Sequence, residues 1–222
     1  MRAIIFVNGQ FDDREAVAQL LRASDILIAA DGGALHCLAL GKVPDVVVGD
    51  LDSLDAALVE ELASRGSKIE RHPVAKNQTD LELAIERAIQ EGANEILLVA
   101  ATGGRLDQSL ANLLILAQRQ WSVPLRVLSN RQFAQVLRDQ ERMELLDRIG
   151  ATLSILPLSP QVTGITYQGM AYPLQNATLA LGSTRGISNE IIASPASVEI
   201  QSGILLVVWD LGGEQPGKTV KQ

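Results

Sequence analysis

Two aspartates, Asp50 and Asp52, stand two residues apart directly after the apolar run 46–48. Carboxylates held that close repel each other unless a cation lies between them. Magnesium is a hard cation that binds one or two carboxylates together with phosphate oxygens and water. The pair therefore points to a metal site at the end of a predicted strand.

Two more aspartates follow similar signals. Asp31 comes directly after the apolar run 26–30, and Asp80 opens a segment with helical spacing. Ligands of an open α/β sheet bind beyond the carboxyl ends of its strands, where loops lead into helices. We therefore expect Asp31, Asp50, Asp52 and Asp80 at one edge of a sheet.

A glycine-rich turn adds a candidate phosphate site. Gly103, Gly104 and Arg105 follow the apolar run 96–101 and precede a predicted helix. Glycines let backbone N–H groups approach phosphates closely, and a helix N-terminus adds partial positive charge. An acidic cluster beside such a turn is typical of a metal–nucleotide site.

The first part of the chain alternates strand and helix patterns, which predicts an α/β fold with a mainly parallel, doubly wound sheet over residues 1–135. Thr79 and Glu82 form a capping box at the start of one helix. The expected strands are 3–7, 26–30, 46–48, 68–71, 96–101 and 125–128, and the expected helices are 13–21, 53–64, 80–90 and 107–118.

The pattern changes after a charged connector at residues 138–148. Short β-rich pieces then follow, separated by Gly, Pro and Asn. They predict a small antiparallel β-sandwich domain over residues 145–211, followed by a flexible tail at 212–222. The expected strands of the sandwich are 152–156, 164–167, 177–181, 197–200 and 204–209.

Single residues of these motifs also have structural interpretations. Asp52, Ser53 and Thr79 fit helix N-caps, and paired glycines are common in ordinary turns. Asp107 fits the start of its helix, and Asn112 fits a solvated helix position. Four acids at strand ends favour the functional interpretation.

The histidines and the cysteine do not suggest a catalytic or metal site. His36 and His72 lack metal-ligand spacing, so we expect them to be structural, and Cys37 to be a small core residue. The sequence shows no pairing of a nucleophile with a base, which favours direct in-line transfer over a covalent intermediate.

Composition limits the partners. The chain has 222 residues and a net charge of −7 with only 19 basic residues, which disfavours nucleic acid as a partner.

Its apolar runs are far shorter than the roughly 20 residues of a membrane span. No export pattern follows the first apolar run, and one cysteine cannot form an internal disulfide. We expect a cytoplasmic protein.

Together the motifs resemble the thiamine pyrophosphokinase family, whose members move a diphosphate from ATP to thiamine. The resemblance covers nearly the whole chain and agrees with the fold predicted above. Its motifs follow in order: Asp31 to Ala34, Gly49 to Ser53, Thr79 to Leu81, Gly103 to Asn112, and Gly186 to Glu190.

The resemblance also implies roles for individual residues. It implies a catalytic cluster of Asp31, Asp50, Asp52 and Asp80, in which the last three hold Mg²⁺. It implies a homodimer whose thiamine pocket is shared between two subunits and contains Ser188 and Asn189. The residues it assigns to the nucleotide are Gly103, Gly104, Arg105, Asp107 and Asn112.

Three positions depart from the family pattern. Asn77 replaces an aspartate of many relatives, and Gln108 replaces a histidine. Leu206 stands where vertebrate relatives stack a tryptophan on thiamine. Two other functions stay open: a diphosphokinase for another primary alcohol, such as a hydroxymethyl pterin, and a non-catalytic nucleotide sensor.

Overall fold

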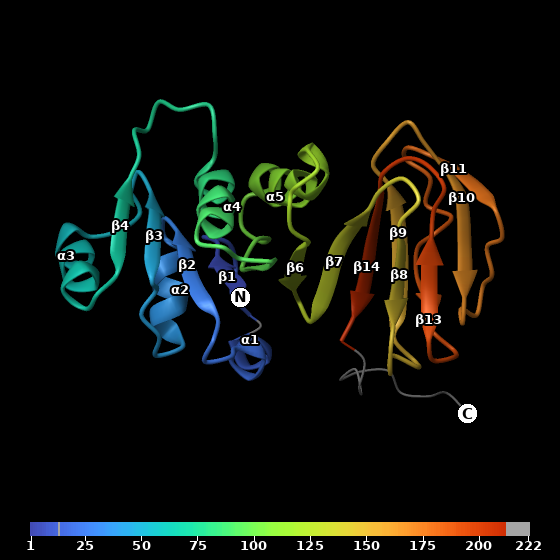
Figure 1. The fold of residues 1–222 in the computed structure, drawn as a ribbon, viewed down its shortest axis with the longest axis horizontal. Helices are drawn as coiled ribbons and strands as arrows, with labels where there is room; N and C mark the ends of the chain where they lie inside the picture. Colours follow the sequence, from blue (N-terminus) through green and yellow to red (C-terminus); the bar gives the residue numbers. More distant parts are fainter. Residues whose placement is uncertain (13, 212–222) are drawn as a thin grey trace. The chain divides into compact units, whose positions relative to one another are not determined.

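The first compact unit, Met1–Arg131, is built on a parallel sheet (Figure 1). The computed structural model describes residues 1–12 and 14–211, and in this part of the chain the unit has six strands in the order β6-β5-β1-β2-β3-β4, all pairs parallel. The strands are β1 (Arg2–Phe6), β2 (Ile26–Ala30), β3 (Val46–Gly49), β4 (Lys68–Arg71), β5 (Glu95–Val99) and β6 (Leu125–Ser129). The predicted parallel sheet is confirmed.

Helices cover both faces of this sheet. Ala29 and Val47 share a buried cluster with residues of α2 and α3. Strand side chains alternate between faces, so the buried Ile28 and Val48 point to the other side, and α4 packs against β1, β2 and β3. The doubly wound arrangement is confirmed. The helices are α1 (Arg14–Leu20), α2 (Gly33–Ala39), α3 (Ala56–Ser64), α4 (Asp80–Gln90) and α5 (Leu106–Gln118).

Helix α4 has the predicted bounds. The hydroxyl of Thr79 accepts a hydrogen bond from the backbone N–H of Glu82 at 3.2 Å, which caps the first turn. Its apolar residues recur at helical spacing, and Leu81, Ala84, Ile85 and Ala88 are buried. Cap and apolar face together start the helix at Asp80.

Helix α2 was not predicted, because its first residue is a glycine and glycine has low helix propensity. A Cβ atom on Gly33 would lie 2.0 Å from the carbonyl oxygen of Phe6, so only glycine allows the helix to approach β1 this closely. Helix α3 begins at Ala56, three residues after the predicted start at Ser53. Residue 13, the predicted start of α1, lies outside the described residues.

The second compact unit begins at Gln132 and is antiparallel. Its strands form two layers, β12-β9-β14-β7 and β11-β10-β13-β8. Leu153 of β9 and Val207 of β14 share one core with Ile165 of β10 and Val198 of β13. The predicted sandwich is confirmed. Its strands are β7 (Gln132–Leu137), β8 (Arg142–Leu145), β9 (Thr152–Pro157), β10 (Gln161–Gln168), β11 (Ala177–Ala180), β12 (Asn189–Glu190), β13 (Ala196–Glu199) and β14 (Leu205–Asp210).

The prediction of a charged connector at 138–148 was wrong, because the segment contains β8. Met143 and Leu145 are buried, while Arg142 and Glu144 are exposed, so the side chains alternate as on a half-buried strand. The many charged residues in this segment made the alternation of apolar and polar residues hard to recognise in the sequence. Strands β7 and β12 were also not predicted. The predicted tail at 212–222 lies outside the described residues.

None of the helices described by the structure is both long and apolar enough to cross a bilayer.

Candidate active site

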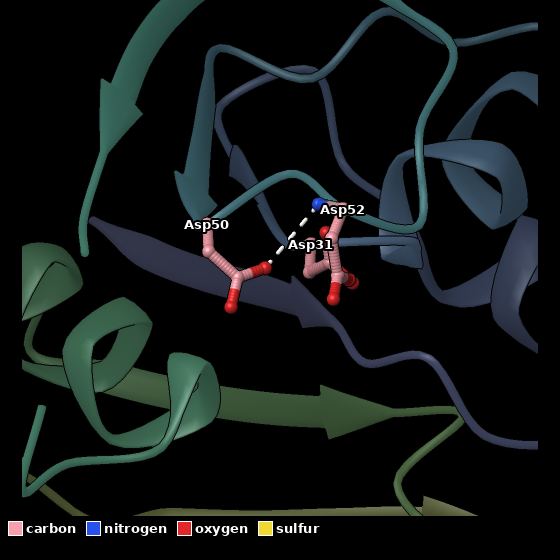
Figure 2. A group of neighbouring side chains, drawn as sticks. All are labelled: Asp31, Asp50 and Asp52. Atoms are coloured by element: carbon pink, nitrogen blue, oxygen red, sulfur yellow. Dashed lines mark hydrogen bonds between the residues drawn. The ribbon is translucent and has the colours of Figure 1, made fainter. Parts of the chain in front are cut away.

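Three aspartates meet at the carboxyl ends of two neighbouring strands (Figure 2). Asp31 follows β2, whereas Asp50 and Asp52 follow β3, which pairs with β2 in parallel. One carboxylate oxygen from each residue lies within 4.8 Å of the other two. The topology therefore gathers three acids that are up to 21 residues apart in sequence.

The backbone at this edge adopts conformations that L-residues rarely take. Asp31 has a φ of 48° and Leu51 a φ of 65°. Hydrogen bonds hold both turns: the N–H of Asp31 donates to Val48 O at 2.9 Å, and the N–H of Asp52 donates to Asp50 Oδ1 at 3.2 Å. Left-handed residues of this kind cluster at functional sites.

Gly49 lets a fourth acid approach. Its φ is 153°, and a Cβ atom there would lie 3.1 Å from Asp31 Cβ and 3.2 Å from Asp80 Cγ. Asp31 and Asp80 thus flank the bare backbone of Gly49, although Asp80 belongs to the first turn of α4. All four aspartates predicted from sequence are brought together.

A lysine lies among these acids. Lys76 Nζ is 2.9 Å from Asp80 Oδ1 and 3.8 Å from Asp50 Oδ2, and its side chain is only 15% exposed. Burial opposes its charge, but the carboxylate charges of Asp80, Asp50 and Asp31 outweigh it, so the pKa of Lys76 is raised. The sequence analysis gave Lys76 no role. Lys76 precedes α4, so its approach to Asp80 depends on how the loop before the helix folds back, which sequence spacing does not reveal.

The donor set fits a hard divalent cation. Asp31 is 8% exposed, and its buried Oδ1 has no hydrogen-bond partner among the described residues. A buried carboxylate oxygen without a partner is costly and calls for an explanation such as an ion. Three carboxylates around one point supply the oxygen ligands that Mg²⁺ prefers.

The loop after β5 forms the second candidate region. Gly103 and Gly104 have φ values of 90° and 69°. Ser109 accepts a hydrogen bond from the N–H of Gly103 at 3.0 Å, and Asn112 Nδ2 donates to Ala101 O at 2.8 Å. The amide of Asn112 thus ties α5 to the loop.

Arg105 and Asp107 are exposed and pair with each other at 2.6 Å. The Arg105 guanidinium holds the pKa of Asp107 below its usual range. Arg105, not Asp107, is the N-cap residue of α5, and its side chain does not cap the helix. The pair lies in the loop and first turn, where a phosphate could compete with the carboxylate for the guanidinium.

The third candidate region lies within the second unit. A pocket of about 250 Å³ contains both predicted substrate residues, Ser188 and Asn189. Ser188 has a φ of 59°, and its N–H donates to Ser154 Oγ at 3.0 Å. No hydrogen bond of its own hydroxyl is found among the described residues. The pocket is lined by Tyr167, Tyr172, Pro173, Leu174, Arg185, Gly186, Ile187, Ser188 and Asn189.

Asn189 has a different place in this pocket. It is 5% exposed, and its Oδ1 accepts from the N–H groups of Tyr172 and Glu190, both at 2.9 Å. Its Nδ2 donates to Tyr172 O at 2.7 Å. The amide therefore holds the Tyr172 segment against β12, which shapes one wall of the pocket.

The three departing positions differ in burial. Leu206 and Trp209 are both buried on β14, and the Trp209 ring packs on Phe133 with centroids 5.5 Å apart. Trp209 is thus a core residue of the sandwich. Asn77 and Gln108 are exposed.

Two family models match the chain. Residues 17–126 match the model described as "Thiamin pyrophosphokinase, catalytic domain". Residues 139–205 match "Thiamin pyrophosphokinase, vitamin B1 binding domain". The first match contains the four aspartates and the glycine turn, and the second contains Ser188 and Asn189.

Whole proteins agree with these matches. The thiamine pyrophosphokinase of Bacillus subtilis (strain 168) is 29% identical over 82% of this chain and 85% of its own. A crystal structure of thiamine pyrophosphokinase from Bacillus subtilis superimposes with a TM-score of 0.83 at 26% identity, covering 95% of this chain and 99% of that one. The thiamin pyrophosphokinase structure from Geobacillus thermodenitrificans gives 0.80 at 27%, covering 96% and 99%.

Proposed function

The chain belongs to the thiamin pyrophosphokinase family, and we propose that it transfers a diphosphate group from ATP to the hydroxyl of thiamine, giving thiamine diphosphate and AMP. One observation carries the proposal beyond the family match. Asp31, Asp50 and Asp52 converge within 4.8 Å at the sheet edge where α/β proteins bind phosphates.

Magnesium is the proposed metal. Asp50, Asp52 and Asp80 would hold it, and when bound it neutralises phosphate charge. Asp31, whose buried Oδ1 has no hydrogen-bond partner within residues 1–12 and 14–211, is proposed as a further ligand or as the group that hydrogen-bonds the attacking hydroxyl. The four carboxylates form the catalytic cluster of the proposal.

The transfer needs no covalent intermediate. The thiamine oxygen attacks the β-phosphorus in line, a new O–P bond forms, and the bond from the β-phosphorus to the oxygen retained by AMP breaks. The hydroxyl proton is released to solvent. Little covalent work falls to the protein in such reactions, so positioning and charge stabilisation dominate.

The nucleotide is proposed to lie over the loop after β5. The backbone N–H of Gly104 and the N-terminus of α5 suit the phosphates, while Gly103, whose N–H is held by Ser109 Oγ, shapes the turn. Arg105 is exposed and could leave Asp107 for a phosphate oxygen. We propose that Asn112 supports this region by holding Ala101.

Thiamine is proposed to bind at the pocket of Ser188. The hydroxyl of this residue, which has no partner among the described residues, suits a polar atom of the substrate, while Asn189 supports the wall beside it.

We further propose a homodimer, in which this pocket completes the site with the carboxylate cluster of a second subunit. The proposed compartment is the cytoplasm.

The test is AMP release from Mg-ATP, measured with and without thiamine. We expect AMP to form in step with thiamine diphosphate and only when thiamine is present. AMP release with a hydroxymethyl pterin in place of thiamine would favour the other diphosphokinase. ATP binding without any AMP release would favour a nucleotide sensor.

A further inference from the structure

Lys76 stands where a cation is expected. Its ammonium lies between Asp80 at 2.9 Å and Asp50 at 3.8 Å, and it donates a hydrogen bond to Pro73 O at 3.2 Å. Both carboxylates are proposed metal ligands. Lys76 thus neutralises part of the repulsion among the four acids.

A bound metal ion would weaken this arrangement. A divalent cation held by Asp50 and Asp80 would place two positive charges beside the ammonium, and like charges at that distance repel strongly in a partly buried site. The phosphate chain of ATP brings negative charge to the same place. The ammonium then has a better partner in a phosphate oxygen than in a carboxylate shared with the metal.

We propose that Lys76 is a further substrate-contacting residue: it neutralises Asp50 and Asp80 in the ligand-free chain, and turns to the phosphate chain of ATP when a metal ion takes these carboxylates. The inference rests on the proposed function and adds a residue to it. A lysine suits this exchange because its compact charge sits on a flexible four-carbon stem.

Two substitutions separate charge from packing. Lys76→Met keeps the length of the side chain and removes the charge, whereas Lys76→Arg keeps the charge. Lys68→Met is the matched control, because Lys68 also pairs with an acid, Glu70 at 3.3 Å, but its side chain is 56% exposed and lies on β4. All variants are first compared with the unaltered chain by thermal unfolding.

The first titration uses magnesium chloride alone, followed by thermal unfolding or calorimetry. Removing one positive charge from the cluster leaves its carboxylates less neutralised, so Lys76→Met should bind Mg²⁺ about tenfold more tightly than the unaltered chain. Lys76→Arg and Lys68→Met should stay close to the unaltered chain.

The second titration uses ATP at saturating Mg²⁺ without thiamine, with AMP as a comparison ligand. Losing a charged hydrogen bond should weaken ATP binding by Lys76→Met about tenfold to a hundredfold. AMP lacks the β- and γ-phosphates, so its affinity should change less. Lys76→Arg should lie between Lys76→Met and the unaltered chain.

Opposite changes, tighter Mg²⁺ and weaker ATP, support the proposal, because general damage would weaken both. Changes in the same direction, or none, would overturn it. So would equal losses for ATP and AMP, or a Lys76→Arg chain that matches Lys76→Met in both titrations. Thiamine-dependent AMP release by the unaltered chain is measured separately: its absence would overturn the proposed function, whereas unchanged titrations in an active enzyme would overturn only the role of Lys76.

Discussion

The carboxylate cluster of the first unit and the Ser188–Asn189 turn of the second unit differ in how well their polar groups are paired. In the cluster, Asp31 Oδ1 is buried with no hydrogen-bond partner in the part of the chain that the structure describes, and Lys76 lies within 4 Å of two acids. In the turn, every polar atom of the Asn189 amide is used by the backbone of Tyr172 or Glu190.

The difference separates two kinds of preparation for a ligand. The cluster holds like charges close together, so its stability depends on a cation, and charge should control its affinity. The turn is satisfied before any ligand arrives, so its hydrogen bonds fix the shape of a pocket. Substitutions in the cluster should therefore change rate and metal binding, whereas substitutions in the turn should change stability and the affinity for one substrate.

The largest effect is expected for the cluster. Asp50→Asn and Asp52→Asn each remove one charged ligand and keep the side-chain shape, so kcat should fall a hundredfold or more, on the order of a few kcal/mol of transition-state stabilisation. The melting temperature should not fall, because one repulsive charge has been removed. Steady-state AMP formation and thermal unfolding measure the two quantities.

Glu61→Gln is the control for charge removal away from the site, since Glu61 is an exposed acid paired with Arg65. It should leave kcat unchanged. Near-normal kcat for Asp50→Asn or Asp52→Asn at ordinary Mg²⁺ would contradict the metal assignment.

A smaller effect, a partial return of activity, is expected when two impaired chains are mixed at a thiamine concentration well below the raised KM. If each site combines the cluster of one subunit with the turn of another, Asp50→Asn chains mixed with Ser188→Ala/Asn189→Ala chains form some dimers with one intact site. Random pairing puts half of all dimers in this class, so activity should return to about a quarter of the unaltered level. Thiamine diphosphate formation after remixing measures it.

Asp50→Asn mixed with Asp80→Asn provides the control, because both changes lie in the cluster and no intact site can form. This mixture should stay inactive. If mass measurement shows mixed dimers of the first pair but activity does not return, the shared site is wrong.

Much of the first unit could be predicted because its signals are local. The bounds of β2 and α4 follow from apolar spacing, and those of α4 also from the Thr79 cap. Helix α2 could not be predicted, since the need for Gly33 comes from β1, which lies far away in sequence. Strand β8 was missed because its exposed charges outweighed the alternation of Met143 and Leu145.

The candidate site divides in the same way. Four acids at strand ends could be predicted to converge, because parallel strands share one edge. The position of Lys76 and the hydrogen bonds of Asn189 could not, since both depend on where loops fold back. Sequence identifies which residue types gather, and the structure shows which of their atoms are already in use.

The smallest effect, and the most discriminating one, concerns the two neighbours in the turn. Ser188→Ala removes a hydroxyl with no partner among the described residues, so the thiamine KM should rise about tenfold while the ATP KM and the melting temperature stay unchanged. Asn189→Ala removes three hydrogen bonds from a buried site and leaves the Tyr172 backbone unpaired. It should cost about 1–3 kcal/mol of stability and also raise the thiamine KM.

Melting curves and both KM values, measured for the two variants side by side, decide between the roles. A stable Asn189→Ala chain with only a thiamine defect would mean that the amide contacts the substrate rather than supporting the pocket wall. An unchanged thiamine KM for Ser188→Ala would remove its hydroxyl from the proposed site. We expect Asn189→Ala to lower stability and Ser188→Ala to change only the affinity for thiamine. The reason is that the Asn189 amide already forms hydrogen bonds within the fold, whereas the Ser188 hydroxyl forms none among the described residues and can bind a ligand.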